Sequence, residues 1–425
     1  MSSVTSSSST HDSSVIESIS RANRGRIPER VELKYQRMSE DVFAFFRGTA
    51  HLFAANWESG VRPVEPGPDI LLCGDLHLEN FGIYVSEDRQ LIFDINDFDE
   101  TLVAPAAFDL SRCLTSILLA ADVWKLRSVR AERIAVAFLD RYRLAIEQMA
   151  DPNSTHQAPA KLKLGPIFEL LGMAARTTQA ELLKSQTRIT KANRLVLRGR
   201  NGLHPRLPKA EQEEILEALH THARTTPHPD AYRVLSLRGR IAGIGSLGVR
   251  RYLVLTEGDG PPDGYWLLDV KQSLPSVVQS FISRPPEICW NSDADRILLA
   301  QRQLLPRPPA SLSSLRIGDA SFRMRSMIPA ENRARLDAFR YKVRKLSQGV
   351  IIAGHVTGCS QARGARYLGE SRYQELADWS RGPGLESILV TAIRHARLSR
   401  RAYQEFCRAL NQRDPRLQLP HIENL

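Results

Sequence analysis

Two clusters of polar residues, separated by one short stretch of chain, carry the side chains best suited to catalysis. The first is Cys73–Gly82 (CGDLHLENFG), which contains Asp75, His77, Glu79 and Asn80. The second is Leu91–Thr101 (LIFDINDFDET), which contains Asp94, Asn96, Asp97, Asp99 and Glu100. Turns favour Asp and Asn, so one such cluster would be ordinary. Two clusters joined by one hairpin predict a site that binds a hard divalent cation through oxygen atoms and keeps one carboxylate to orient a nucleophile.

Two known enzyme classes have patterns related to these clusters. Metallophosphoesterases begin with Asp-x-His after a strand, which Asp75 and His77 match, but their later Gly-Asp and Gly-Asn-His elements are missing. The run Gly74-Asp75-Leu76-His77 with Asn80 resembles the catalytic loop of aminoglycoside phosphotransferases and related kinase-like enzymes, with Cys73 where that pattern has His. Phe108-Asp109-Leu110 is similar to the Asp-Leu pair that opens a helix after the metal-binding Asp of those enzymes.

The kinase-like resemblance implies a role for each matching residue. Asp75 would accept or orient the proton of the acceptor hydroxyl, and Asn80 with a downstream Asp would hold Mg²⁺ on the nucleotide phosphates. Asp97 matches the local pattern of the downstream Asp, whereas Asp94 better matches the spacing from Asp75. Asp97 is the first choice for the metal ligand and Asp94 the second.

A kinase-like site also needs a loop over the phosphates and a lysine, and both are found downstream. Gly243, Gly245, Ser246 and Gly248 lie in a turn (GIGSLG) between two expected strands, and Lys271 ends a third strand in LLDVKQS. Glycine lets backbone N–H groups approach phosphate oxygens, and lysine supplies a point charge. This order of elements resembles a kinase small lobe: a strand, a glycine-rich turn, a second strand, another turn, and a third strand that carries the lysine. Asp295 is the candidate acidic partner of Lys271.

The order of these motifs predicts an α/β (α+β) protein with two kinase-like lobes in circularly permuted order. Residues 1–25 are expected to be a disordered Ser-rich tail. Residues 26–226 would form a helical lobe with the catalytic loop, 227–330 a small β-rich lobe over the nucleotide, and 331–425 helices that pack on the helical lobe. The expected helices are Arg37–Trp57 (N-cap Ser39), Asp109–Met149, Lys161–Arg200, Asp293–Leu305, Arg333–Ile352 and Leu385–Leu410. The expected strands are Ile70–Cys73, Phe81–Val85, Gln90–Ile95, three within Tyr232–Lys271, and Ser321–Ile328.

Composition sets broader limits on the function. The 425 residues are 42% hydrophobic and 25% charged, as in an ordinary soluble globular chain. Five scattered cysteines without a CxxC pair, and no signal peptide or apolar run of membrane-spanning length, predict a cytoplasmic protein. The net charge of +11 fits a phosphate-bearing partner and leaves nucleic acid open as a partner. A nucleotide-binding pseudokinase-like regulatory protein, a basic nucleic-acid-binding protein and a metal-dependent phosphohydrolase remain alternatives to a phosphotransferase.

The chain after the tail also resembles a bacterial family known as domain of unknown function 2252. The matching stretches are RMSEDVFAFFRGTA (Arg37–Ala50), GDLHLENFG, NDFDET, GIGSLGVRRYLVL, LLDVKQSLPS and ARGARYLG (Ala362–Gly369). That family brings no established activity. Arg47, in the first stretch, is expected either to bind a phosphate or to form a salt bridge with a nearby carboxylate. The function expected from the sequence is therefore transfer of phosphate from ATP, with Mg²⁺, to a hydroxyl of an unknown small-molecule or protein acceptor.

Overall fold

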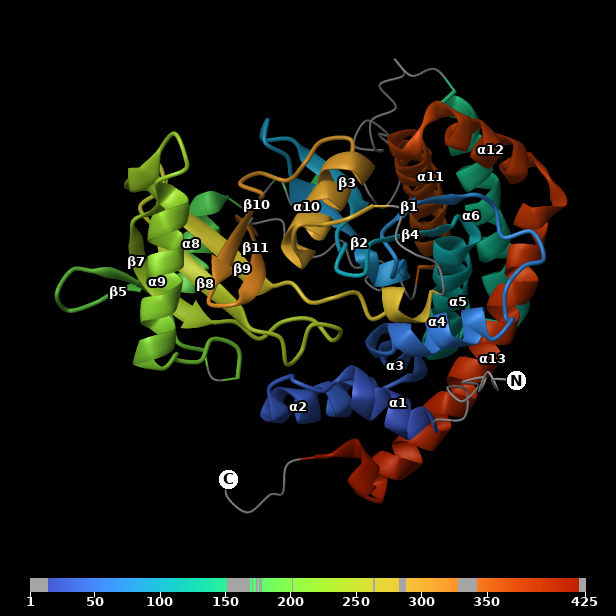
Figure 1. Cartoon of the computed structure of the whole chain (residues 1–425), viewed down its shortest axis with the longest axis horizontal. Coiled ribbons are helices and arrows are strands. Elements are labelled where there is room, and N and C mark those ends of the chain that lie inside the picture. The colour runs from blue at the N-terminus through green and yellow to red at the C-terminus, as the bar shows by residue number, and fades with distance from the viewer. Residues whose placement is uncertain are drawn as a thin grey trace, which may run out of the picture.

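The computed structural model describes residues 14–150, 178–200, 202–262, 264–282, 288–327 and 342–419, together with residues 169, 171, 172 and 175. Over these residues the chain is a mixed α/β protein with small sheets, as expected for its fold class. It has a larger part rich in helices and a smaller part built on one antiparallel sheet (Figure 1). None of the helices in the described ranges is long and apolar enough to cross a membrane.

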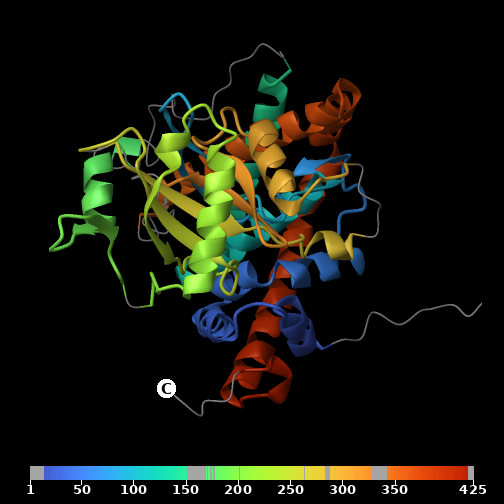
Figure 2. The same ribbon diagram turned by 60° about the vertical axis from the view of Figure 1, so that its left-hand side comes forward.

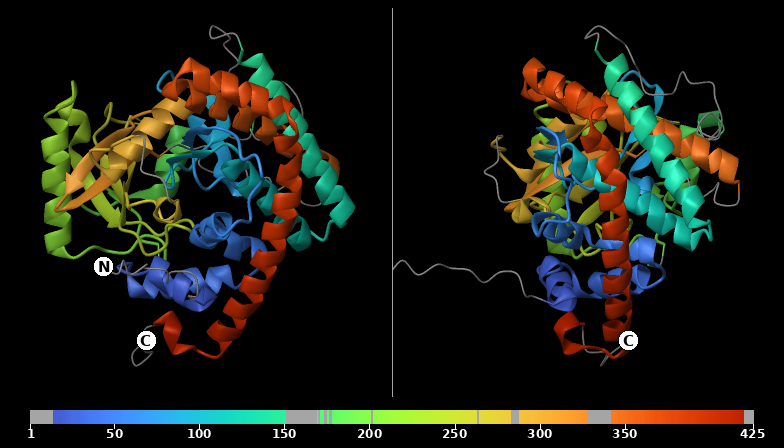
Figure 3. Two further views of the ribbon diagram at one scale, coloured as in Figure 1. Left: turned by 45° about the vertical axis from the view of Figure 1, so that its right-hand side comes forward. Right: turned by 90° about the vertical axis from the view of Figure 1, so that its right-hand side faces the viewer.

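The helical part consists of α1–α6, β1–β4 and α11–α13. Its helices are α1 (Val15–Ala22), α2 (Pro28–Met38), α3 (Val42–Gly48), α4 (Ala50–Glu58), α5 (Ala107–Val123), α6 (Ser128–Gln148), α11 (Val343–Leu368), α12 (Glu370–Arg381) and α13 (Pro383–Asn411). Its strands are β1 (Asp69–Leu72), β2 (Phe81–Val85), β3 (Leu91–Ile95) and β4 (Leu102–Pro105). Apolar side chains of α5, α6, α11 and α13 share one hydrophobic core with the strands. Figure 3 shows α13 running along the outside of this part.

Glycines of α11 let this helix lie directly on its neighbours. A Cβ at Gly354 or Gly358 would come within 2.4 or 2.6 Å of the Phe138 or Tyr142 carbonyl oxygen of α6. A Cβ at Gly364 would come within 2.2 Å of the Leu71 carbonyl oxygen of β1. The helix that fixes the position of β1 therefore needs these glycines for packing.

Two short strand pairs bring the two polar clusters together. β1 pairs with β4 in antiparallel register, with Leu72 opposite Leu102, and β2 pairs with β3, with Gly82 opposite Asp94. The loop after β1 and the loop after β3 therefore lie side by side. Gly74 marks their closest approach, because a Cβ there would lie 1.9 Å from the carbonyl oxygen of Glu100, and its φ of +84° also favours glycine.

The sheet part has five strands in the order β10-β11-β9-β8-β7. They are β7 (Val234–Gly239), β8 (Arg251–Thr256), β9 (Trp266–Gln272), β10 (Ser313–Ile317) and β11 (Ala320–Ser326). α9 (Lys209–Ala223) covers one face, where Ile215 and Leu219 pack against Tyr252, Val254 and other apolar residues, and Figure 2 shows this helix in front of the sheet. α8 (Gln179–Gln186) and the hairpin of β5 (Thr187–Ile189) and β6 (Leu195–Leu197) pack on the other face. α10 (Asp293–Leu304) lies between β9 and β10 in the sequence and packs against β11 and α11.

Several expected elements differ from the structure. The disordered tail predicted to residue 25 is wrong from Val15, because α1 buries Ile16 and Ile19 against α2 and α13. The single helix expected over Arg37–Trp57 is divided at Ser39 and Thr49, and Asp41 rather than Ser39 caps α3 by accepting the Ala44 N–H at 2.7 Å.

The basic stretch Lys161–Arg200 is not one helix in its described residues, because α8 ends at Gln186 and the β5–β6 hairpin follows. Together with α9 it packs on the sheet, so these elements adjoin the small β-rich part rather than the helical one. β4 and β10 had not been expected. The start of the helix predicted at Arg333 lies outside the described residues, and the helix itself continues sixteen residues beyond Ile352, to Leu368.

Candidate functional site

A cavity of about 850 Å³ lies between the helical part and the sheet part. Its lining includes seven of the nine residues that the sequence proposed for catalysis, phosphate binding or metal binding: Asp75, Asn80, Asp97, Gly243, Gly245, Ser246 and Lys271. Asp75 and Lys271 are 196 positions apart in the chain. The fold therefore brings the catalytic-loop motif, the glycine-rich turn and the lysine to one cavity.

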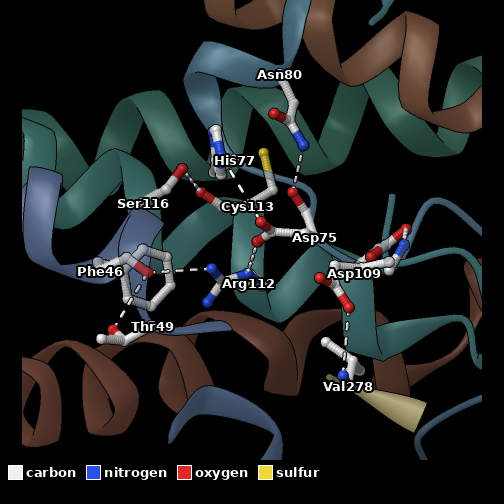
Figure 4. Close-up of polar contacts among 12 residues, drawn as sticks. Phe46, Thr49, Asp75, His77, Asn80, Asp109, Arg112, Cys113, Ser116 and Val278 are labelled. Carbon is white, nitrogen blue, oxygen red and sulfur yellow. Dashed lines mark hydrogen bonds and ion pairs between the residues drawn. The ribbon is translucent and has the colours of Figure 1, made fainter. Parts of the chain in front are cut away.

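Asp75 is held by Arg112, a fully buried arginine of α5. The Arg112 Nε–H donates to Asp75 Oδ1, and one terminal N–H of Arg112 donates to the Phe46 carbonyl oxygen at 3.1 Å (Figure 4). The guanidinium also lies 4.2 Å from the centroid of the Phe46 ring. Burial raises the pKa of Asp75 to about 7; Arg112 opposes this shift, and Glu100 and Asp97 add to it. The Asp75 carboxylate is thus oriented by the protein while its side chain stays 20% exposed to the cavity.

Backbone contacts fix the loop that carries Asp75. The Asp109 carboxylate, in the first turn of α5, accepts the N–H groups of Cys73 and Gly74 at 3.2 and 3.4 Å. The Asn80 Nδ2–H donates to the Asp75 carbonyl oxygen at 2.5 Å, which sets the orientation of the amide (Figure 4). His77 is buried and its pKa is well below the usual value because of desolvation, with Arg47 and Arg112 adding, so its imidazole is neutral.

Lys271 pairs with Asp99, which lies two residues after Asp97. The Lys271 Nζ–H donates to Asp99 Oδ2, and Arg323 Nε of the neighbouring strand lies 3.6 Å from Asp99 Oδ1. Lys271 and Arg323 hold the pKa of Asp99 well below its usual range. Asp295 does not pair with Lys271 as expected, because its carboxylate accepts from Ser292 and Ser314 at the start of α10.

The cavity face of the sheet is strongly cationic. Lys271 lies opposite Arg251 on β8 and opposite Arg323 on β11 in the strand register. Because side chains alternate between faces, Asp269 shares their face and accepts two hydrogen bonds from Arg251, each of 2.6 Å. Arg240 and Arg325 also lie within 4.0 Å of this buried carboxylate. The sheet part therefore lines the cavity with five cations: Arg240, Arg251, Lys271, Arg323 and Arg325.

The N-terminal segment holds the glycine-rich turn through its carbonyl groups. Arg26 donates to the Gly245 and Leu247 carbonyl oxygens at 2.6 and 2.8 Å, and Arg37 donates to the Gly243 carbonyl oxygen at 3.3 Å. The Ile27 N–H donates to the Gly248 carbonyl oxygen at 3.0 Å. These contacts tie the turn to α2, so it is not a free flap over the cavity.

Three residues named in the sequence analysis are not placed to bind a metal ion or a phosphate as first expected. Asp94 does not line the cavity; it is buried on β3, and burial raises its pKa to about 7 while Arg363 of α11 opposes the shift. Gly248 does not line the cavity either. It packs against Arg26, because a Cβ there would lie 2.7 Å from the Arg26 side chain. Arg47 lines the cavity but forms the salt bridge that was one of its two expected roles, 2.7 Å from Glu79.

Sequence reasoning missed Arg112, Lys34 and His51, all of which are buried. Arg112 is the only charged residue between Asp109 and Asp122, which was a usable signal because a charge inside a buried helix needs a partner. Lys34 follows Val31 and precedes Tyr35 and Met38 at helical spacing, so it falls on the buried face of α2. His51 gives no comparable signal in the sequence.

The cavity offers two protein oxygen ligands for a cation, which are too few to form a metal site by themselves. Among the described residues, no three His, Cys, Asp or Glu side chains gather in a group that could hold a metal ion. Asn80 and Asp97 supply an amide oxygen and a carboxylate to the same cavity. Mg²⁺ is commonly bound by one or two protein oxygen ligands together with substrate phosphates and water. Asn80 and Asp97 would therefore be enough to hold a magnesium ion whose other ligands come from a bound phosphate and water.

Comparison with known proteins places the chain in a family. No curated protein and no solved structure matches it. A family model matches residues 26–409, which include every residue that lines the cavity except Ala22 and nearly all of the described elements. The chain therefore belongs to the family described as an uncharacterized protein conserved in bacteria (DUF2252).

Proposed function

We propose that this protein is an ATP- and Mg²⁺-dependent phosphotransferase with a kinase-like fold in permuted order. The single observation that carries the proposal is the common cavity of the Asp75 loop, the glycine-rich turn and Lys271. Such a cavity supplies the parts that phosphoryl transfer needs, which are a loop and a lysine for the phosphates, oxygen ligands for Mg²⁺, and a carboxylate for the acceptor.

The sheet part supports the kinase-like assignment by its order of elements. The order along the chain is β7, the glycine-rich turn, β8, β9 with Lys271, and then α10. This order resembles a kinase small lobe, including the helix that follows the lysine strand. Because the sheet part is encoded after the Asp75 loop, the kinase-like order would be circularly permuted.

The proposed reaction uses the residues of the cavity as follows. The acceptor hydroxyl oxygen attacks the γ-phosphorus of ATP, the bond from that phosphorus to the β–γ bridging oxygen breaks, and ADP leaves with the electron pair. The hydroxyl proton passes to the Asp75 carboxylate, which Arg112 orients. Lys271 and the N–H groups of the glycine-rich turn bind phosphate oxygens. Mg²⁺, held by Asn80 and Asp97, would neutralise charge that develops on the phosphates.

A thermal-shift titration with ATP, with and without Mg²⁺, tests whether the cavity binds nucleotide. Ligand that binds only the folded state raises the melting temperature. We expect a Mg²⁺-dependent rise in the wild type that disappears in Lys271→Ala. Lys209→Ala is the matched control, because it removes an exposed lysine of α9 that does not line the cavity. No rise in the folded wild type at saturating ATP, or an equal rise in Lys271→Ala, would contradict the proposal.

A nucleotide-binding pseudokinase-like protein is the second candidate, and one observation favours it. Lys271 pairs with Asp99 of the acidic loop and not with an acid of α10, so a lysine–helix ion pair of the kinase type is replaced. Such a protein would show the same rise in melting temperature with ATP but would form no ADP. ADP formation by the wild type therefore distinguishes the two candidates.

A further inference from the structure

A second polar group in the cavity takes no part in the proposed transfer step. It consists of Lys34 on α2 and His51 on α4, and both side chains line the cavity. Each residue is only 3% exposed, so the two are nearly as buried as the apolar core. Polar groups at such depth are normally paired with hydrogen-bonding or charged partners.

Lys34 has a neutral partner where a buried cation would ordinarily have a carboxylate. Its Nζ–H donates to Asn23 Oδ1 at 2.8 Å. Asn23 is itself fixed, because its Nδ2–H donates to the Ile19 carbonyl oxygen at 2.8 Å. No carboxylate lies within ion-pair distance of Lys34 among the described residues, and two further N–H donors remain on its ammonium group. A buried charge without an opposite charge is costly, so this arrangement suits an anion that comes from outside.

His51 adds a second unpartnered polar atom to the same place. Its Nε2 is buried and has no hydrogen-bond partner within the part of the chain that the structure describes. Burial lowers the pKa of His51 to about 3, and the nearby charges of Lys34, Arg112 and Arg26 act in the same direction. The imidazole is therefore neutral and can donate one hydrogen bond from Nε2 in the appropriate tautomer.

These groups lie close to the proposed reaction centre. Lys34, His51, Arg26 and Asp75 all line the same cavity. Burial lowers the pKa of Lys34 well below its usual value; the charge of Arg26 adds to this shift, whereas the charges of Glu100 and Asp75 oppose it. Arg26 in turn binds the carbonyl oxygens of Gly245 and Leu247 in the glycine-rich turn. Lys34 and His51 thus share one cavity with the glycine-rich turn and the Asp75 loop.

We infer that Lys34 and His51 form a subsite for an anionic group, so that the acceptor is a hydroxyl compound that also carries a phosphate or a carboxylate. The role as acceptor rests on the proposed phosphotransferase function, whereas the anion subsite does not depend on it. A charged hydrogen bond to Lys34 would orient the acceptor so that its hydroxyl meets Asp75.

The test measures melting temperatures with inorganic phosphate and, separately, with malonate as probes. Wild type is compared with Lys34→Met, with Lys34→Gln in case the first variant folds poorly, and with His51→Leu. Lys271→Ala reports binding at the phosphate-donor site instead, and Lys209→Met controls for loss of a positive charge elsewhere. The larger response to phosphate or to malonate identifies which anion the subsite accepts.

The inference predicts two effects of opposite sign. Without added anion, Lys34→Met melts a few degrees higher than the wild type, because a buried amine with one neutral hydrogen-bond partner has been replaced by an apolar side chain. With phosphate or malonate, the wild type and Lys271→Ala gain stability, whereas affinity falls by about tenfold or more in both Lys34 variants. His51→Leu shows a smaller loss of affinity.

Three possible results distinguish a failure of the anion subsite from a failure of the proposed phosphotransferase function. A shift with anion that is lost in Lys271→Ala and kept in the Lys34 variants overturns the subsite and leaves the proposed function standing. A lower melting temperature of Lys34→Met with an unchanged anion response means that Lys34 is only structural, which also overturns the subsite. A Lys34-dependent anion shift in a protein that binds no ATP supports the subsite and contradicts the proposed function.

Discussion

At the scale of single residues, the pairing of Asp75 with Arg112 is the central feature of the cavity. Arg112 is fully buried, bonds to Asp75 and to the Phe46 carbonyl oxygen, and stacks on the Phe46 ring. The carboxylate that would serve as catalytic base is therefore oriented before any ligand binds. Such preorganisation lowers the cost of reaching the reactive geometry.

Replacing Arg112, the cationic member of this pair, should destabilise the protein strongly. Arg112→Met leaves the largely buried Asp75 without its opposite charge, so we expect the free energy of unfolding to fall by about 3–5 kcal/mol. Arg400→Met is the matched control, because it breaks an exposed ion pair with Asp122 and should cost less than about 1 kcal/mol. Urea unfolding measures both values. Equal stability of the two variants would show that the buried pair has no special importance.

Residue types and spacing were enough to identify part of the cavity from the sequence. Asp75, Asn80, Asp97 and Lys271 were singled out by pattern and do line it, although their roles stay predictions. Asp99 as the partner of Lys271 could not be foreseen, because the pairing depends on how a loop after β3 meets a strand of another sheet. Lys34 and His51 were missed for another reason: the spacing around Lys34 indicates burial but not a cavity, and His51 gives no signal in the sequence.

At the scale of elements, α11 is longer than the sequence interpretation predicted. The helix was expected to end at Ile352, yet it continues to Leu368 through a stretch that contains Gly354, Gly358 and Gly364. Glycine weakens an isolated helix, but here it lets α11 contact the backbone of α6 and β1. By contrast, the strands around Lys271 and the hairpin of β2 and β3 were predicted well, since their alternating pattern and turn residues are local signals.

Adding a single methyl group to this helix contact should be harmful. Alanine is favoured over glycine in a helix by about 1 kcal/mol, so Gly358→Ala would stabilise α11 if the helix were isolated. In the structure the new Cβ would lie 2.6 Å from the Tyr142 carbonyl oxygen, which forces α6 and α11 apart. We therefore expect a lower midpoint of urea unfolding for Gly358→Ala. A raised midpoint would mean that the two helices do not pack as closely as described.

At the scale of the whole molecule, the cavity is lined by charges of both signs. The helical part contributes Asp75, Asp97 and Glu100 together with the cations Arg26, Lys34 and Arg47, and the sheet part contributes Lys271 and Arg323. The helical part is also tied to the sheet part by the contacts of α2 with the glycine-rich turn. The proposed ligand, a nucleotide with its Mg²⁺, would carry both signs of charge and so would match this lining better than a simple anion or cation. The net charge of +11, in contrast, does not by itself distinguish nucleotide from nucleic acid.

The most direct test of phosphoryl transfer is ADP formation from ATP by the wild type and by Asp75→Asn, with Mg²⁺ and a protein-free extract of bacterial metabolites as the source of acceptors. Asn keeps an oxygen that accepts the Arg112 hydrogen bond, so the variant should fold and bind ATP like the wild type. We expect Mg²⁺-dependent ADP formation by the wild type and a loss of at least about 100-fold in Asp75→Asn, because a general base typically contributes that much. Equal rates in the two proteins, or no ADP from a wild type that binds ATP, would contradict the proposed function.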